Sequence, residues 1–421
     1  MGTPCVTPEM VREAQVRLKG IAQKTGLSYS NSVSHVAGCQ VYLKMENLQR
    51  TGSFKLRGAY NKVAALTDEE RAKGVIAASA GNHAQGVALA ATSYGCKSIV
   101  CMPKHAPLMK IAATKGYGAE VVLHGDFFDE AAAKAQELSD KFGYTYVHPF
   151  NDPYVMAGQG TIALEVLEQL PDVDAIVVPI GGGGFNSGIS GAAGSFGGGL
   201  ISGIAVAAKS VNPKIRIIGV QSANMPSMQK SVYDGAICTY DGMATLADGI
   251  AVKRPGDLTY AVCRDYVDDI VTVDEGEIAA AILWLIERVK TVSEGAGATP
   301  VAALMNHKIL GLDKKKVVAV ISGGNIDVNN MTRIINSGLT EAWRKACFTT
   351  VIPDRPGELV RLLSIIAESG ANVLAVTHER SQHGMGAKHS AVTLELETAN
   401  EKHVDDLKQR LINEKYEVIF K

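Results

Sequence analysis

Four short segments of the chain combine reactive or ligand-binding residue types with close spacing. In the first, TGSFKLRGAY, a helical pattern begins at Ser53, which is predicted as the N-cap and puts Lys55 in the first turn. A cation there faces the positive end of the helix dipole, so the neutral amine required for imine formation is favoured. Most lysines in first turns are solvated surface residues, and this motif alone favours that interpretation.

The second segment, GVIAASAGNHAQG, lies between a predicted strand and a predicted helix. Such a junction offers unpaired backbone N–H groups to a carboxylate. It contains five residues of interest: Ser79, Ala80, Gly81, Asn82 and His83. An N-cap turn, in which Asn82 caps the helix and His83 is partly buried, explains the segment equally well.

In the third segment, DAIVVPIGGGGFNSG, four glycines follow a predicted buried strand, so the backbone can wrap around a phosphate group. They are Gly181, Gly182, Gly183 and Gly184. A dinucleotide site is less suitable, because the next strand ends in Gln221 rather than an acid and the spacing is not GxGxxG. A flexible glycine linker remains an alternative.

The glycine motif is imperfectly duplicated, because GGGFNSGIS (182–190) and GGGLISGIA (197–205) match at six of nine positions. The second copy, 197–199, leads into the better helical pattern. We expect 181–184 to bind the phosphate because they directly follow the strand. In the fourth segment, VVAVISGGN, a strand is predicted to end at Ser322, whose hydroxyl suits a heterocyclic nitrogen or an ordinary turn.

The elements that must position these residues alternate between strand and helix from about residue 41 to 325. Such alternation predicts βαβ units with parallel sheets, whose ligands bind at the carboxyl ends of the strands. The apolar β-branched runs are 41–46, 74–79, 98–103, 120–125, 144–149, 174–180, 215–221, 269–273 and 316–322. The first helix is predicted after an N-cap at Thr7 with Pro8 at its first position.

Beyond about residue 335 the pattern changes to βαββαβ in fewer than eighty residues, which predicts a separate ferredoxin-like domain. Its helices are predicted from Pro356 to Ser369 and near 400–414. Its strands are expected in 346–357, 371–381, 389–398 and 416–420.

Composition is that of a soluble globular protein, with 421 residues, 46% hydrophobic, 20% charged and a net charge of -1. The length suggests two or three compact units, and the charge favours neither nucleic acid nor membrane. Seven scattered cysteines without a CxxC pair indicate neither a disulfide framework nor a zinc site. Without a signal core or an apolar run of ~18 residues, we expect an unanchored cytoplasmic protein.

In this order, SFKLRGA, SAGNHAQG, GGGG after VVPI, and SGGN resemble the fold-type II pyridoxal-phosphate enzymes, and most closely the threonine dehydratases. MENLQRTGSFK, AGQGTIALE, TLADGI and SEGAGA extend the resemblance over about residues 5 to 330. The tail, with DRPGEL and GANVLAVTHER, resembles an ACT domain. The resemblance implies two parallel-sheet subdomains of the tryptophan synthase beta-like type. The catalytic domain would span 1–335, with the smaller subdomain at about 50–155, and the ACT domain 345–421.

The resemblance also implies a cofactor, pyridoxal 5'-phosphate, and roles for the residues above. Lys55 would bind the cofactor covalently and remove the α-proton of the substrate. The rest of the cofactor site would comprise Phe54, Asn82 at the ring oxygen, Gly181, Gly182, Gly183 and Gly184 at the phosphate, and Ser322 at the pyridine nitrogen. The substrate loop would comprise Ser79, Ala80, Gly81 and His83.

The implied activity is dehydration and deamination of L-threonine, and of L-serine, to a 2-oxo acid and ammonia, in a homo-oligomeric dimer or tetramer. An amino-acid effector would bind near Asp354 to Gly357 and Asn372 of the ACT domain. Serine racemase is the nearest alternative, but racemases of this type carry a serine where this chain has Ala80. A Rossmann oxidoreductase and a catalytically inactive amino-acid sensor are the other two alternatives.

Overall fold

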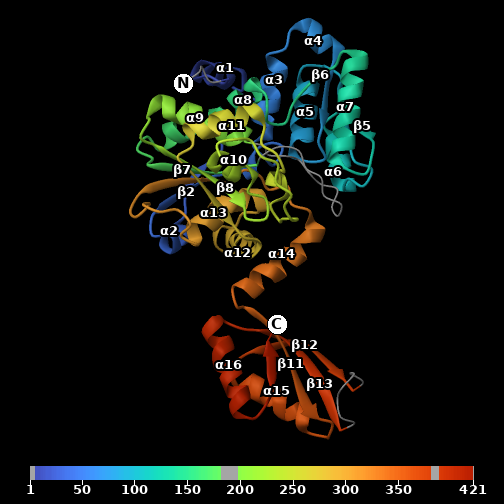
Figure 1. The fold of residues 1–421 in the computed structure, drawn as a ribbon, viewed down its shortest axis with the longest axis vertical. Coiled ribbons are helices and arrows are strands. Elements are labelled where there is room, and N and C mark those ends of the chain that lie inside the picture. The colour runs from blue at the N-terminus through green and yellow to red at the C-terminus, as the bar shows by residue number, and fades with distance from the viewer. Residues whose placement is uncertain (1–4, 182–197, 381–387, 421) are drawn as a thin grey trace. The chain divides into compact units, whose positions relative to one another are not determined.

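The structure is a computed structural model that describes residues 5–181, 198–380 and 388–420. It divides into two compact units, Met1–Asp327 and Val328–Lys421, each with its own core (Figure 1). No helix in the described parts of the chain has the length and apolar character needed to cross a membrane.

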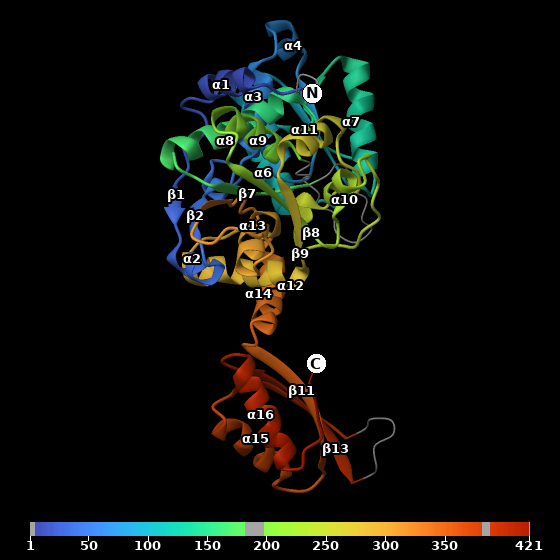
Figure 2. The same ribbon diagram turned by 60° about the vertical axis from the view of Figure 1, so that its left-hand side comes forward.

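The first unit contains a six-stranded sheet in the order β1-β2-β10-β7-β8-β9, in which only β1 is antiparallel to its neighbour. Its strands are β1 (Leu27–Tyr29), β2 (Gln40–Lys44), β7 (Ala175–Pro179), β8 (Arg216–Ser222), β9 (Asp269–Val273) and β10 (Lys316–Val320). Helices α9 and α13 pack on this sheet from opposite faces (Figures 1 and 2). Coverage of both faces explains why its inner strands are apolar throughout.

The same unit contains a smaller parallel sheet in the order β5-β4-β3-β6. Its strands are β3 (Val75–Ala78), β4 (Ser98–Met102), β5 (Glu120–Leu123) and β6 (Thr145–Tyr146). Successive residues of a strand point to opposite faces. Accordingly Val75 and Ala77 join a core with α3 and α5, whereas Ile76 and Ala78 pack on α7.

Helices connect nearly all of these strands. Those before residue 175 are α1 (Pro8–Arg17), α2 (Asn31–Ala37), η1 (Glu46–Leu48), α3 (Lys55–Ala64), α4 (Asp68–Lys73), α5 (Asn82–Ser93), α6 (Leu108–Gly116), α7 (Phe128–Phe142) and α8 (Pro153–Gln169). Those after it are α9 (Gly199–Val211), α10 (Ser227–Tyr233), η2 (Asp248–Ile250), α11 (Asp257–Tyr266), α12 (Glu275–Trp284), η3 (Leu285–Val289) and α13 (Gly295–Met305).

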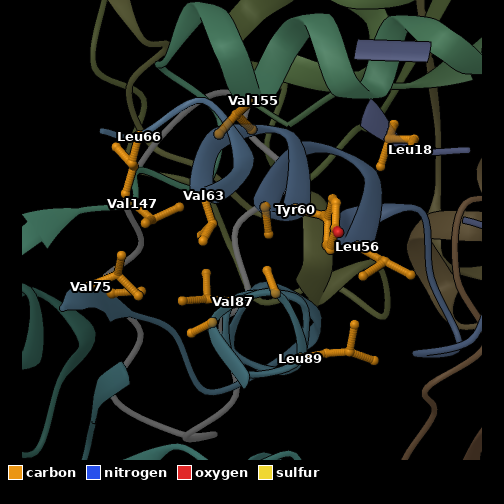
Figure 3. Close-up of a cluster of buried hydrophobic side chains, with 14 residues drawn as sticks. Leu18, Leu56, Tyr60, Val63, Leu66, Val75, Val87, Leu89, Val147 and Val155 are labelled. Carbon is orange, nitrogen blue, oxygen red and sulfur yellow. The ribbon is translucent and has the colours of Figure 1, made fainter. Parts of the chain in front are cut away.

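Helix α3, which begins at Lys55, is held by apolar packing along its length. Figure 3 shows its residues Leu56, Tyr60 and Val63 facing Val87 and Leu89 of α5 in one buried cluster. Burying such a side chain stabilises a fold by about 1.5–3 kcal/mol, so the cluster fixes α3 firmly against α5.

The second unit begins with α14 (Val328–Glu341) and continues as a βαββαβ unit. Its elements are β11 (Lys345–Pro353), α15 (Glu358–Glu368), β12 (Asn372–Glu379), β13 (His389–Glu397), α16 (Glu401–Asn413) and β14 (Val418–Phe420). The sheet order is β12-β13-β11-β14, and all its pairs are antiparallel. Leucines and isoleucines of α15 and α16 cover the sheet and form the core.

The predicted fold class is confirmed, and all nine predicted strands of the first unit are present as β2 to β10. The predicted cap of α1 is also present, because Thr7 accepts a hydrogen bond from the Met10 backbone and Pro8 is the first helical residue. Strand β1 was not predicted, because three residues, two of them exposed, leave no apolar pattern.

Several predicted boundaries were wrong, and three of them matter for the functional sites. Strand β10 ends at Val320, two residues before Ser322. Helix α15 begins at Glu358, because Gly357, with φ of 94°, takes the N-cap position and Pro356 precedes it. The third error concerns Ser53 and is described with the site.

Candidate active site

The loop before α3 and the loop after β10 are paired with each other, which brings the lysine motif and the SGGN motif together. Ser53 and Gly323 form an antiparallel bridge. The Phe54 N–H donates to the carbonyl of Ser322 at 3.1 Å. Lys55, the next residue, therefore begins its helix beside the carboxyl end of β10, where ligands of parallel sheets bind.

Lys55 is buried, with 1% of its surface exposed, and its Nζ donates to the carbonyl of Pro149 at 2.8 Å. Burial lowers the pKa of Lys55 to about 7, and the nearby Glu294 carboxylate partly opposes that change. Desolvation disfavours an ammonium ion, so the protein itself favours the neutral, nucleophilic amine. The larger cause is therefore burial, whereas the sequence suggested the helix dipole.

Ser53 is not the N-cap of α3, contrary to the prediction. Phe54 occupies that position, with helical φ and ψ angles and no side-chain cap. The Ser53 hydroxyl is buried and has no hydrogen-bond partner in the described structure. The chain turns into α3 one residue later than predicted because Phe54 is tied to the β10 loop.

Asn82 is the first residue of α5 and is 4% exposed. Its Nδ2 donates to both carboxylate oxygens of Glu294, at 2.9 and 3.1 Å. Its Oδ1 accepts from Nδ2 of Asn325 at 2.7 Å. The N-cap of the helix is Gly81, so the interpretation of Asn82 as the cap was wrong.

His83 is fully buried rather than partly buried, and its Nε2 bonds to the carbonyl of Val147 at 2.8 Å. Burial, and secondly the Lys55 charge, lower the pKa of His83 to about 3. The imidazole is therefore neutral, and because a carbonyl only accepts, Nε2 carries its proton. A neutral ring offers no charge to a carboxylate, so His83 can contribute to substrate binding mainly through its backbone N–H.

The rest of the substrate loop is also buried. The Ser79 hydroxyl accepts from the Gly81 N–H at 3.2 Å, which shapes the turn before α5. Ala80 lies in an apolar cluster with residues of α5 and β4. The first backbone N–H groups of α5 have no partner within the helix and follow directly on this loop. The carboxylate role of Ser79 to Gly81 remains a prediction.

The glycine segment after β7 is described only at its two ends. Gly181 is buried and follows Ile180, but Gly182 to Gly184 and Gly197 lie outside the described residues. Helix α9 begins at Gly199, with Gly198 as its N-cap at φ of 54°. The first helix after β7 in the described residues thus starts at the second copy of the glycine motif. The assignment of the phosphate to 181–184 remains a prediction.

Gln221, whose residue type made a dinucleotide-binding site less suitable, has a structural role. Its Oε1 accepts from the Gln229 N–H at 2.8 Å, and its side chain is fully buried. The residue ties the end of β8 to α10 and is not free to bind a ribose.

Three buried charges and one partly buried carboxylate hold the lysine helix against the large sheet. Arg57 pairs with Glu46 at 2.8 Å and with Glu165 at 2.6 Å, and Lys44 also pairs with Glu165 at 2.6 Å. These residues come from β2, η1, α3 and α8. Burial is tolerated because each charge is paired and hydrogen-bonded. The cluster fixes α3 two residues after Lys55.

Sequence reasoning assigned no role to three groups at this site: the carboxylate of Glu294, the amide of Asn325 and the carbonyl of Pro149. Burial raises the pKa of Glu294 to about 7, with the charge of Asp248 adding to the effect. SEGAGA and SGGN were recognised as family motifs, but only the tertiary structure brings Glu294 and Asn325 to Asn82. The available signal was a lone acid before a glycine-rich helix start.

The residues present suit pyridoxal phosphate. The hydroxyls of Ser53 and Ser322 are both buried and have no partner in the described structure, so each can bond to a ligand atom. Buried polar atoms are normally satisfied, and such exceptions near a buried amine indicate a ligand site. Ser322 would lie at the pyridine nitrogen, Asn82 at the ring oxygen and Lys55 at the aldehyde.

Comparison with known proteins agrees with this site. The family model described as "Pyridoxal-phosphate dependent enzyme" matches residues 19–195 and 192–323. The two matched ranges overlap at residues 192–195, between the two glycine copies, so the family model does not run continuously through this segment. The L-threonine ammonia-lyase of Thermotoga maritima is 54% identical over 98% of this chain and 99% of its own length.

Among solved structures, threonine deaminase isoform 2 of Solanum lycopersicum has a TM-score of 0.71 and 37% identity, covering 78% of this chain and 87% of that one. Serine racemase of Dictyostelium discoideum has a TM-score of 0.70 and 35% identity, covering 77% of this chain and 100% of that one. The fold alone therefore does not separate deamination from racemisation. The family match and the near-full-length relative place this chain in the family of pyridoxal-phosphate-dependent enzymes.

Proposed function

We propose that this protein catalyses the dehydration and deamination of L-threonine, and of L-serine as a second substrate, to 2-oxobutanoate or pyruvate and ammonia. The observation that carries the proposal is the buried Lys55 amine, with its pKa lowered to about 7, beside Asn82 and Ser322. Curated relatives named L-threonine ammonia-lyase support threonine as the substrate.

When bound, pyridoxal phosphate withdraws electrons from the substrate and acidifies its α-proton. Lys55 would hold the cofactor, and its amine would serve as the general base that removes the α-proton of the substrate. The N-terminus of α5, with Ser79 to Gly81, binds the substrate carboxylate through backbone N–H groups. Gly181 to Gly184 bind the cofactor phosphate.

Ser322 contributes a neutral hydroxyl to the pyridine nitrogen, not a carboxylate that would hold it protonated. With a neutral partner at its nitrogen, the cofactor ring would be a weaker electron sink, which would suit an elimination in which the departing hydroxyl carries the negative charge away.

Ala80 separates the proposed reaction from racemisation. Racemisation requires an acid on the face of the substrate opposite Lys55, and a methyl group cannot supply a proton. Ala80 is 1% exposed and packs among apolar side chains. We therefore expect 2-oxo acid formation with no accumulation of the D-enantiomer.

The test uses the purified full-length protein with pyridoxal phosphate. A visible absorption band should form, and borohydride should fix the cofactor on Lys55, as located by peptide mass spectrometry. Lys55→Ala should lose both the band and at least about 10³-fold of the 2-oxo acid formation, since one group supplies nucleophile and base. The exposed Lys115→Ala is the matched control and should keep both. Trapping on another lysine would contradict the proposal.

We further propose that the second unit is an ACT domain that binds an amino-acid effector near Asp354 to Gly357 and Asn372, at an interface within a homo-oligomer. The βαββαβ order supports this assignment. Gly357, with φ of 94°, opens a tight turn at the start of α15, and Asn372 begins β12. A cytoplasmic location is supported by seven cysteines that are all free thiols.

A further inference from the structure

Glu294 occupies the N-cap position of α13 but does not cap that helix. An acidic N-cap residue normally accepts from the backbone N–H groups of its own first turn. Here φ and ψ are those of a cap, yet no side-chain capping bond is made. The side chain is 6% exposed and reaches Asn82 of α5 instead. A stabilising local bond is thus given up for a contact 212 residues away in the sequence.

The contact fixes which way the Asn82 amide points. A carboxylate only accepts hydrogen bonds, and a protonated carboxyl group still keeps one oxygen that only accepts, so the Asn82 nitrogen faces Glu294, at 2.9 and 3.1 Å. On the other side, Asn325 donates to Asn82 Oδ1 at 2.7 Å and to the carbonyl of Thr51 at 2.8 Å. An amide nitrogen has two hydrogens. Glu294 occupies one direction, and the second hydrogen remains to donate elsewhere.

Gly323 makes room for this arrangement. A Cβ at that position would lie 2.8 Å from Cδ of Glu294 and 3.3 Å from Nδ2 of Asn82. The Gly323 carbonyl also accepts from the Glu294 N–H at 3.0 Å. The SGGN motif therefore positions Glu294 in two ways. The Gly323 carbonyl binds the Glu294 backbone, and the lack of a side chain at Gly323 leaves space for the Glu294 carboxyl group.

We propose that Glu294 is a positioning residue that orients the Asn82 amide, so that Asn82 donates its second N–H to the ring oxygen of pyridoxal phosphate. This inference rests on the proposed function, which places the cofactor at Lys55. Without the Glu294 acceptor, the buried Asn82 nitrogen would lose its partner, and the amide would gain by turning away.

The test measures binding of two ligands to the protein freed of cofactor: pyridoxine 5'-phosphate and its 3-deoxy analogue, which lacks the ring oxygen. Neither has an aldehyde, so neither reacts with Lys55, and the ratio of their dissociation constants reports the ring-oxygen contact alone. We expect the wild-type protein to prefer pyridoxine 5'-phosphate by about tenfold, as for one hydrogen bond to a charged group.

Glu294→Met removes the acceptor and should bring that ratio to within about twofold of one. Glu294→Gln keeps an acceptor oxygen and should retain most of the preference. Glu277→Met, which changes a glutamate of the α12 capping box, is the matched control and should leave the ratio unchanged. In a double-mutant cycle, adding Glu294→Met to Asn82→Ala should change nothing further, because the two residues act through one contact.

The inference would be overturned if a folded Glu294→Met protein kept the wild-type ratio of the two dissociation constants. It would also be overturned if the effects of Glu294→Met and Asn82→Ala on that ratio were additive. Should Glu294→Met fail to fold, Glu294→Leu provides the same test, because it also removes both acceptor oxygens and leaves Asn82 untouched. A wild-type protein that binds neither ligand would instead contradict the proposed function, so the two failures are distinguishable.

Discussion

At the scale of single residues, the site is defined by groups whose burial is unfavourable for folding. Lys55 is a buried amine and Glu294 a buried carboxyl group, and burial is the largest cause of both pKa changes. Each group would be more stable in water. Their charges interact, and the hydroxyls of Ser53 and Ser322 have no hydrogen-bond partner among the described residues, a combination that indicates chemistry rather than packing.

Lys55→Met should increase the free energy of unfolding of the cofactor-free protein, and the size of this increase should depend on pH. The pKa of Lys55 falls from 10.5 in the unfolded chain to about 7 on folding. Its burial therefore costs most below pH 7, and the cost fades as the pH rises from 7 to 10.5. We expect a gain of at least about 1 kcal/mol in the free energy of unfolding at pH 6.5, since one pKa unit corresponds to about 1.4 kcal/mol.

Urea unfolding at pH 6.5 and 9.5 measures this gain, which should be smaller at the higher pH. Lys115→Met, at an exposed position, should change stability by less than about 0.5 kcal/mol at either pH. If Lys55→Met increased the free energy of unfolding equally at both pH values, burial of the Lys55 ammonium would not be the cause of the increase.

At the scale of elements, the position of Lys55 depends on how closely α3 approaches α8. A Cβ on Gly58 would lie 2.7 Å from the carbonyl of Val155, and one on Gly158 would lie 2.7 Å from Cα of Gly58. The two glycines thus face each other where the helices cross. Backbone cannot yield in such a contact as a flexible side chain can.

Gly58→Ala should therefore separate the helices and destabilise the first unit by about 1–3 kcal/mol, as overpacking does. Gly116→Ala in α6 is the control, because no atom lies within 4 Å of its added Cβ and alanine favours a helix more than glycine does. The melting temperatures of the Gly58→Ala and Gly116→Ala proteins in thermal unfolding measure both effects. An equal melting temperature for Gly58→Ala and the wild-type protein would show that the crossing has room to adjust.

At the scale of the whole molecule, the two units have separate cores, and the residues proposed to act in catalysis all lie in the first. Deleting the residues after 340 should leave cofactor binding intact, because no catalytic group is lost. It should change the substrate saturation curve and abolish the response to any effector found by thermal-shift screening of the standard amino acids. If saturation curve and effector response were both unchanged, regulation by the second unit would be wrong.

The sequence by itself determined the class of fold, nine strands of the first unit and the order of elements in the second. These features are local, since apolar periodicity and β-branched runs are read over a few residues. It also selected Lys55, Asn82 and Ser322, because their motifs in this order resemble those of a known enzyme family. The exact helix starts at Lys55 and Glu358 depended on contacts outside the local segment.

Only the tertiary structure decided how those residues act. Glu294 and Asn325 lie more than two hundred residues from Asn82 in the sequence, and no local pattern reports a contact of that range. Likewise, the lowered pKa values of Lys55 and His83 result from burial, which depends on every element packed around them. Residue types and spacing are properties of a segment, whereas desolvation and hydrogen-bond orientation are properties of the assembled fold.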